Sequence, residues 1–219
     1  MVVLASGCGN PLNVYVDSRF VESGGATSSN VEVRASKASV TITSLAGEGI
    51  MTANFSYTDI PNQPLIDYKV AAGKGTLIVK EPSDVVIQPN GVYEWALKFN
   101  QDTPLNMSLM LGEGVNNINA GGLKLTDLYL NIKGGKTTLD LRGVTVGLNP
   151  RVKTEGGKLT IRLPSDLGVK IRAEEGFESI TADGLSRNGN TYVNSLWDTA
   201  KENFEVELRI SDGQVIVLA

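Results

Sequence analysis

Residues Leu128 to Leu141, LYLNIKGGKTTLDL, contain the pattern from which the fold is predicted. Apolar and polar residues alternate on both sides of the Gly134-Gly135 pair, which predicts two short strands flanking a tight bend. The same frame recurs around four more glycines. The five reference glycines are Gly114, Gly135, Gly157, Gly176 and Gly213. The first four are separated by 21, 22 and 19 residues, and such a near-constant period is typical of stacked supersecondary units.

Apolar residues recur at fixed offsets from these glycines, which places them on one side of the chain. Five residues before each glycine stand Leu109, Leu130, Val152, Ile171 and Leu208. Four residues after each glycine stand Ile118, Leu139, Ile161, Ile180 and Val217. In the region before residue 100, Val31, Val33, Val40 and Ile42 flank Ser36 at the same spacing, with serine in place of the glycine. The chain is therefore predicted to be all-β.

Two all-β architectures accommodate this pattern. In a single-stranded β-solenoid, each glycine pair is a corner, and equivalent strands stack in parallel from one rung of 19 to 22 residues to the next. In an antiparallel β-sandwich of hairpins, Gly134-Gly135 and Gly156-Gly157 are two-residue type I′ turns. The recurrence of one residue class at each offset favours the solenoid, because stacking places like residues over one another.

Changes in composition divide the chain into three parts. Residues 1–29 are expected to hold the remnant of a signal sequence and a flexible tether rich in Ser, Gly and Asn. Residues 30–100 are predicted to form an N-terminal β module. Residues 101–219 are predicted to form the repeats, packed with the module as one continuous unit.

The charge and residue inventory exclude several functions. The net charge is −4 and Lys and Arg are scattered, so nothing suggests nucleic-acid binding. No apolar run reaches the length of about 18 residues that a membrane span needs. The chain contains no histidine and only one cysteine, so the commonest general base and the usual zinc ligands are missing. We expect no cofactor and no metal site.

The single cysteine, Cys8, follows Val3-Leu4-Ala5-Ser6-Gly7 and precedes a polar, turn-rich stretch. Small residues before such a cysteine resemble the lipobox of bacterial lipoproteins, in which the cysteine thiol carries diacylglycerol. Ala5 stands where leucine is usual in that family. Met1-Val2-Val3 supplies neither the basic nor the full apolar part of a signal peptide, as if the signal had been trimmed or the start assigned too late. The alternative is an unmodified cysteine. We expect Cys8 to be the site of lipid attachment.

The carboxylates do not form the facing pairs that glycoside hydrolysis requires. Five residues after its reference glycine, Asp140 is expected to meet Asn119, Arg162, Thr181 and Leu218 of the other units. A carbohydrate-active β-helix enzyme is therefore the least favoured function, and no catalytic residue is assigned.

Two aromatic residues, Tyr192 and Trp197, lie in the one long interruption of the repeats, from residue 183 to 203. Aromatic side chains in an exposed loop can stack on glycans or anchor a protein partner. Alternatively, they cap the apolar end of the stack, as terminal repeats require. They are the candidate binding surface. Tyr93 and Trp95 are expected to be buried between the two blocks of strands.

The stretches Gly49–Tyr57, Asp67–Val70 and Gly75–Val79 resemble the N-terminal module of the toast-rack family. Residues 95–219, above all Gly156–Pro164, resemble the toast-rack β-solenoid shared with bacterial cell-wall-active-antibiotic response proteins. This resemblance implies an envelope-associated protein. Some relatives modulate sensor kinases of the envelope stress response, and a related family of lipoproteins is described as adhesin heads. Its motifs are structural and transfer no functional residue.

Together these observations predict a non-catalytic lipoprotein of the bacterial cell envelope, facing outside the cytoplasm. It would present a rigid β scaffold to an envelope protein, a glycan or a signalling partner, and would meet the membrane only through the lipid on Cys8. An adhesin-like or glycan-binding module is the alternative.

Overall fold

The computed structural model describes residues 12–144, 147–175 and 179–219. Within these ranges the chain forms seventeen strands and one short 3-10 helix, η1 (Ile60–Asn62), so the all-β prediction is confirmed. The strands are β1 (Val14–Val21), β2 (Ser28–Ala35), β3 (Ser39–Leu45), β4 (Met51–Thr58), β5 (Leu65–Ala71), β6 (Lys74–Lys80), β7 (Tyr93–Asn100), β8 (Leu105–Leu111), β9 (Val115–Asn119), β10 (Leu125–Ile132), β11 (Lys136–Asp140), β12 (Arg151–Arg162), β13 (Gly168–Glu175), β14 (Ile180–Asp183), β15 (Ser186–Asn188), β16 (Thr191–Val193) and β17 (Asn203–Leu218). No helix in the described ranges has the length and apolar character to cross a membrane.

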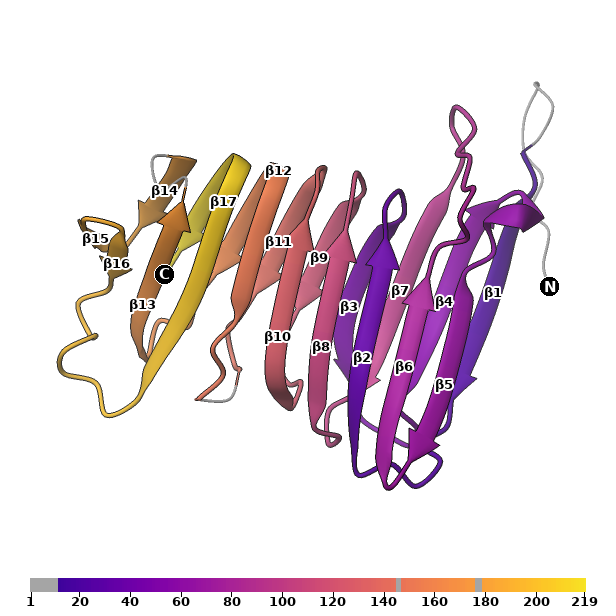
Figure 1. The fold of residues 1–219 in the computed structure, drawn as a ribbon, viewed down its shortest axis with the longest axis horizontal. Helices are drawn as coiled ribbons and strands as arrows, with labels where there is room; N and C mark the ends of the chain where they lie inside the picture. Colours follow the sequence, from indigo (N-terminus) through magenta and orange to yellow (C-terminus); the bar gives the residue numbers. More distant parts are fainter. Residues whose placement is uncertain (1–11, 145–146, 176–178) are drawn as a thin grey trace.

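The strands lie in two facing layers along the long axis of the molecule (Figure 1). One layer has the order β5-β6-β2-β8-β10-β12-β17-β13-β16-β15, and the other has the order β1-β4-β7-β3-β9-β11-β12-β17-β14. The long strands β12 and β17 bend across a corner and contribute to both layers. Hydrogen bonding is therefore continuous from one layer to the other.

Strand pairing is parallel in the middle of the molecule and antiparallel at its ends. Across β8, β10, β12 and β17, the residues five before each reference glycine lie side by side: Leu109, Leu130, Val152 and Leu208. At the N-terminal end, β1–β4, β4–β7 and β5–β6 pair antiparallel. At the C-terminal end, β16 pairs antiparallel with both β13 and β15. Equivalent residues of successive units therefore stack in register through the middle.

The apolar core lies between the two layers. It is built from the inward residues of each strand, which alternate with exposed ones as the period of two requires. Near the N-terminal end the core is aromatic: Trp95 packs edge-on against Phe55 and Tyr93, with ring centroids 5.6 and 5.8 Å apart. Tyr93 and Trp95 are buried, as predicted.

The expected flexible tether is shorter than predicted. Val14–Val21, assigned to the tether, instead forms β1 and pairs antiparallel with β4 along its whole length. Tyr15 also stacks on Tyr57, with ring centroids 5.8 Å apart. The physical reason is that β4 would otherwise leave an open edge of unpaired backbone groups. The mixed polar sequence of β1, VYVDSRFV, is typical of such an edge strand.

The predicted frame is displaced by two residues in two units. Val33 pairs with Leu109, and Ile42 pairs with Ile118, so Ala38 rather than Ser36 is the equivalent of Gly114. In β13, Ala173 rather than Ile171 pairs with Leu208. A shift of two preserves which side chains point inward, so alternation alone does not reveal it. Gly176, the reference glycine of that unit, lies outside the described residues.

Candidate binding surface

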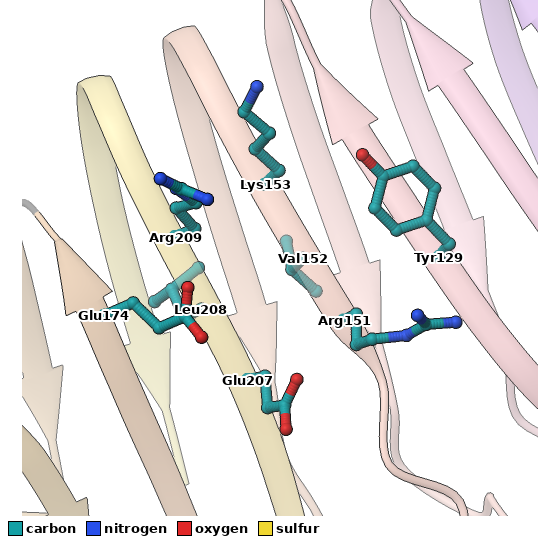
Figure 2. Close-up of a pocket in the computed structure, with 8 residues that line it drawn as sticks. All are labelled: Tyr129, Arg151, Val152, Lys153, Glu174, Glu207, Leu208 and Arg209. Atoms are coloured by element: carbon teal, nitrogen blue, oxygen red, sulfur yellow. The ribbon is translucent and has the colours of Figure 1, made fainter.

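The outward side chains of four neighbouring strands line a shallow groove on one layer (Figure 2). Its volume is about 180 Å³. The lining residues are Tyr129 from β10, Arg151, Val152 and Lys153 from β12, Glu207, Leu208 and Arg209 from β17, and Glu174 from β13. Val152 and Leu208 are buried and form the floor. The polar side chains therefore form the part that a ligand would meet.

Parallel, in-register pairing arranges these polar side chains in rows across the strands. In one row Arg151 lies between Tyr129 and Glu207, and in the next Lys153 lies beside Arg209. Adjacent strands are about 4.8 Å apart, so neighbours within a row are in reach of a single ligand. The two rows stand six and four residues before the reference glycines. The repeat frame therefore contained the signal for this groove, at outward positions of the strands that precede each glycine.

Ion pairs hold Arg151 and Lys153, two cationic side chains of the groove. The Arg151 guanidinium is 2.8 Å from a carboxylate oxygen of Asp127 and 6.0 Å from the centroid of the Tyr129 ring. The Lys153 ammonium is 2.5 Å from the Glu155 carboxylate, and its hydrogen bond lowers the pKa of Glu155 below its ordinary value. The groove therefore combines an aromatic wall, fixed positive charge and the carboxylates of β13 and β17.

Trp197 lies on the same outward face, beside β13. Its ring centroid is 4.5 Å from the Lys170 ammonium, a cation–π contact. Lys170 and Arg172 both reach the Glu205 carboxylate, at 3.1 and 3.0 Å. Because Arg172 pairs in register with Glu207, this cluster continues the rows of the groove. Trp197 is partly exposed, and the fold brings it to the same face as Arg151 and Tyr129.

Tyr192 does not contribute to this surface. Only 3% of it is exposed, and it lies in β16 opposite Ile171 of β13. On its other side the Arg187 guanidinium is 5.7 Å from the ring centroid. Tyr192 is buried rather than exposed, because the β15–β16 hairpin lies against β13 and turns it inward. Of the two roles expected for this residue, the cap fits this position. The residue acts as part of a cap on the end of the stack.

Asp140 lies beside Asn119 and Arg162, as predicted, but Asp183 rather than Thr181 occupies the corresponding position of β14. The Asp140 carboxylate is 2.5 Å from the Arg142 guanidinium and 3.7 Å from that of Arg162. The hydrogen bonds from Arg142 lower the pKa of Asp140. A general acid that works near neutral pH needs a raised pKa instead.

Cys8, the expected lipid site, lies outside the described residues.

These features define a class: an all-β repeat protein with glycine corners, an apolar core between two layers and a charged outer face. The profile of the N-terminal domain of toast_rack matches residues 12–171, and the chain belongs to this family. The match starts just before β1 and runs into β13.

Solved structures resemble this chain to different degrees. One from Clostridium sporogenes ATCC 15579, designated "putative cell adhesion protein", is 27% identical, with a TM-score of 0.82 over 93% of this chain and 98% of that one. A "putative adhesin" from Bacteroides fragilis NCTC 9343 is 10% identical, with a TM-score of 0.34 over 94% of this chain and 97% of that one. No protein with curated annotation matches the chain.

Proposed function

We propose that this protein is a non-catalytic, adhesin-like scaffold of the bacterial cell envelope. In this proposal a lipid on Cys8 holds it at the membrane, and the outward face with the groove of Figure 2 binds an envelope protein or glycan. The observation that carries the proposal is the likeness to the Clostridium sporogenes structure. It extends over 93% of this chain at 27% identity, and that structure carries the designation "putative cell adhesion protein".

The repeat geometry supports a scaffold role. We infer that the chain is a single-stranded β-solenoid, because the reference residues of β8, β10, β12 and β17 stack in parallel and in register. Parallel stacking turns any outward position of the repeat into a straight row of side chains. Such a row is a rigid surface, which binds without first having to be ordered.

The electrostatics of the groove suit the binding of a polar ligand. The Lys153 ammonium lowers the pKa of Glu155, so this carboxylate beside the groove stays ionised. An ionised carboxylate forms ion pairs and accepts hydrogen bonds. The groove adds Tyr129 and Arg151, an aromatic and a forked cation of the kinds enriched in binding hot spots.

The lipid anchor is tested by fractionation. Expressed with a complete signal peptide, the protein should sediment with membranes and take up radiolabelled fatty acid. Cys8→Ser should release it and abolish labelling. Membrane association of Cys8→Ser equal to that of the wild type would refute the anchor.

The binding face is tested with the full chain against envelope extract. A Tyr129→Ala/Arg151→Ala/Trp197→Ala variant should lose the captured protein or glycan at least tenfold. A Thr138→Ala/Thr160→Ala variant, altered on the opposite layer at outward positions that pair in register, should retain it. Equal capture by both variants would place the binding site elsewhere.

A further inference from the structure

The strand β1 shortens the connection between Cys8 and the folded chain. Only residues 9–13 separate Cys8 from Val14, the first residue of β1. Six fully extended steps reach at most about 20 Å. A lipid on Cys8 would therefore keep the first strand within about 20 Å of the bilayer surface, instead of letting the domain move freely on a long tether.

The chain enters the fold at one corner of the N-terminal end. Val14 pairs with Thr58, the last residue of β4, and η1 follows directly, next to the start of β1 (Figure 1). The side chain of Asn62 in η1 donates hydrogen bonds to the carbonyls of Thr58 and Val86, both at 2.8 Å. The Val86 N–H in turn donates to the Asn62 side-chain oxygen at 3.3 Å. Buried Asn62 thus fastens the segment after β6 to the place where the chain enters.

Four large apolar side chains are exposed around this point. Leu12 is 37% exposed, Ile60 61%, Leu65 50% and Val86 63%, and together they form what we term the N-terminal corner. Leu12 and Ile60 each lie two residues beyond the Val14–Thr58 pair, and Leu65 opens the strand after η1. Among the described residues, nine large hydrophobic side chains are exposed, and four of them belong to this corner. Exposed apolar side chains that gather in one place are typical of an interaction surface.

We propose that the N-terminal corner rests on the lipid bilayer and orients the molecule end-on to the membrane. The inference rests on the lipid proposed at Cys8, which brings this corner, and not the far end, to the bilayer. The contact is apolar in character, because the exposed side chains of the corner are aliphatic. The exposed residues next to them in the sequence, Asp59 and Asp84, are acids and offer no attraction to anionic lipid. Shallow insertion of apolar side chains is favourable at a membrane interface, and it needs no anionic lipid.

This orientation has a consequence for the binding surface. The groove lies on β10, β12, β17 and β13, toward the opposite end of the stack (Figure 1). It would therefore be displayed away from the membrane, where a partner can approach it.

The test uses the lipidated full chain in phosphatidylcholine vesicles. A bimane label is attached to Val86→Cys in one sample and to Asn188→Cys, at the exposed far end, in another. The vesicles contain lipids with doxyl groups in the acyl chains, and the quenching of bimane fluorescence by these lipids is measured. We expect at least twofold quenching at position 86 and none at position 188. In the chain labelled at position 86, the further substitution Ile60→Asp should at least halve the quenching. Adding Val115→Asp, at a residue 54% exposed on β9, should leave it unchanged.

The outcomes separate the orientation from the anchor. Cys8 carries no free thiol if it is lipidated, so one label per chain and flotation with vesicles confirm the anchor independently. Flotation without quenching at position 86 overturns the orientation and leaves the anchor intact. A label whose emission is blue-shifted but not quenched by lipid would show that protein, such as a second copy of the chain, covers the corner. This result also overturns the orientation. Equal quenching at both positions overturns it as well. Two labels per chain and no flotation refute the anchor itself, and the orientation with it.

Discussion

The carbonyl oxygen of Gly135 lies 2.5 Å from the position that a Cβ atom on Gly157 would occupy. The same carbonyl accepts a hydrogen bond from the Lys158 N–H at 2.9 Å. In the next unit, the carbonyl of Gly157 lies 2.6 Å from the Cβ position of Gly213. The corners are therefore stacked backbone on backbone, with no room for a side chain between them.

Gly157→Ala should destabilise the protein by about 2–4 kcal/mol, because the methyl group meets the Gly135 carbonyl and φ is +79°. Urea unfolding measures the loss. Gly25→Ala is the matched control: its φ is +80° but nothing lies within 4 Å of its Cβ position, so it should cost only about 1–2 kcal/mol. Equal losses would show that close stacking contributes nothing.

Asn116→Ala should cost about 1–3 kcal/mol, since it leaves a buried backbone donor without an acceptor. Asn116 is buried; its side-chain oxygen accepts a hydrogen bond from the Val40 N–H at 3.2 Å, and its amide donates to the Thr137 hydroxyl at 3.2 Å. Thermal and urea unfolding check the change. Its neighbour Asn117 is exposed, and Asn117→Ala should stay within about 0.5 kcal/mol of the wild type. The prediction fails if the two variants are equally stable.

Asp140→Asn should lower the free energy of unfolding by about 0.5–1 kcal/mol at pH 7, through loss of the ion pairs with Arg142 and Arg162. Because the pKa of Asp140 is lower in the folded state, its stabilisation is present above the unfolded value of about 3.9 and is lost as the pH falls through the folded value. Urea unfolding at pH 7, 4 and 3 should show the difference from the wild type shrinking below about pH 4. Asp67→Asn, at a pair with Lys69 in which both side chains are more than half exposed, should have little effect at any pH. A constant difference for Asp140→Asn across this range would contradict the prediction.

Tyr192→Ala should destabilise the protein by about 3 kcal/mol or more, because it empties a buried site over β13. Trp197→Ala, at a partly exposed residue, should cost about 1 kcal/mol or less and act on binding instead. Unfolding by urea and capture of the envelope ligand are measured on the same two variants. Loss of binding by Tyr192→Ala without loss of stability would contradict the role as a cap.

The repeat frame revealed much of the fold because it is local. Alternation around Gly135 and Gly157 specifies which side chains point inward, and the spacing of the glycines specifies where the chain turns. The stacking of Leu109, Leu130 and Val152 followed from those two properties alone. The displacement of two residues at Ala38 could not be seen, since both registers bury the same set of side chains.

The candidate site was only partly accessible from sequence. Tyr192 and Trp197 were both predicted as candidate binding residues from their place in a long insertion. Only the packing of the β15–β16 hairpin against β13 shows that Tyr192 is buried whereas Trp197 is partly exposed. Three groove residues stand six positions before their reference glycines: Tyr129, Arg151 and Glu207. Because they differ in residue type, only their pairing across strands shows that they form a single surface.

Alternation and glycine spacing were enough to predict an all-β chain, its turns at glycine and the apolar face of each strand, because these properties depend on neighbours along the chain. Three features became visible only in the folded molecule: residues 14–21 form an edge strand, Asn116 is buried against Val40, and exposed apolar side chains gather at the N-terminal corner. Each of these depends on a partner at least 30 residues away in sequence, as in the pairing of Val21 with Met51 and of Val14 with Thr58, or on contacts between strands that alternation does not encode.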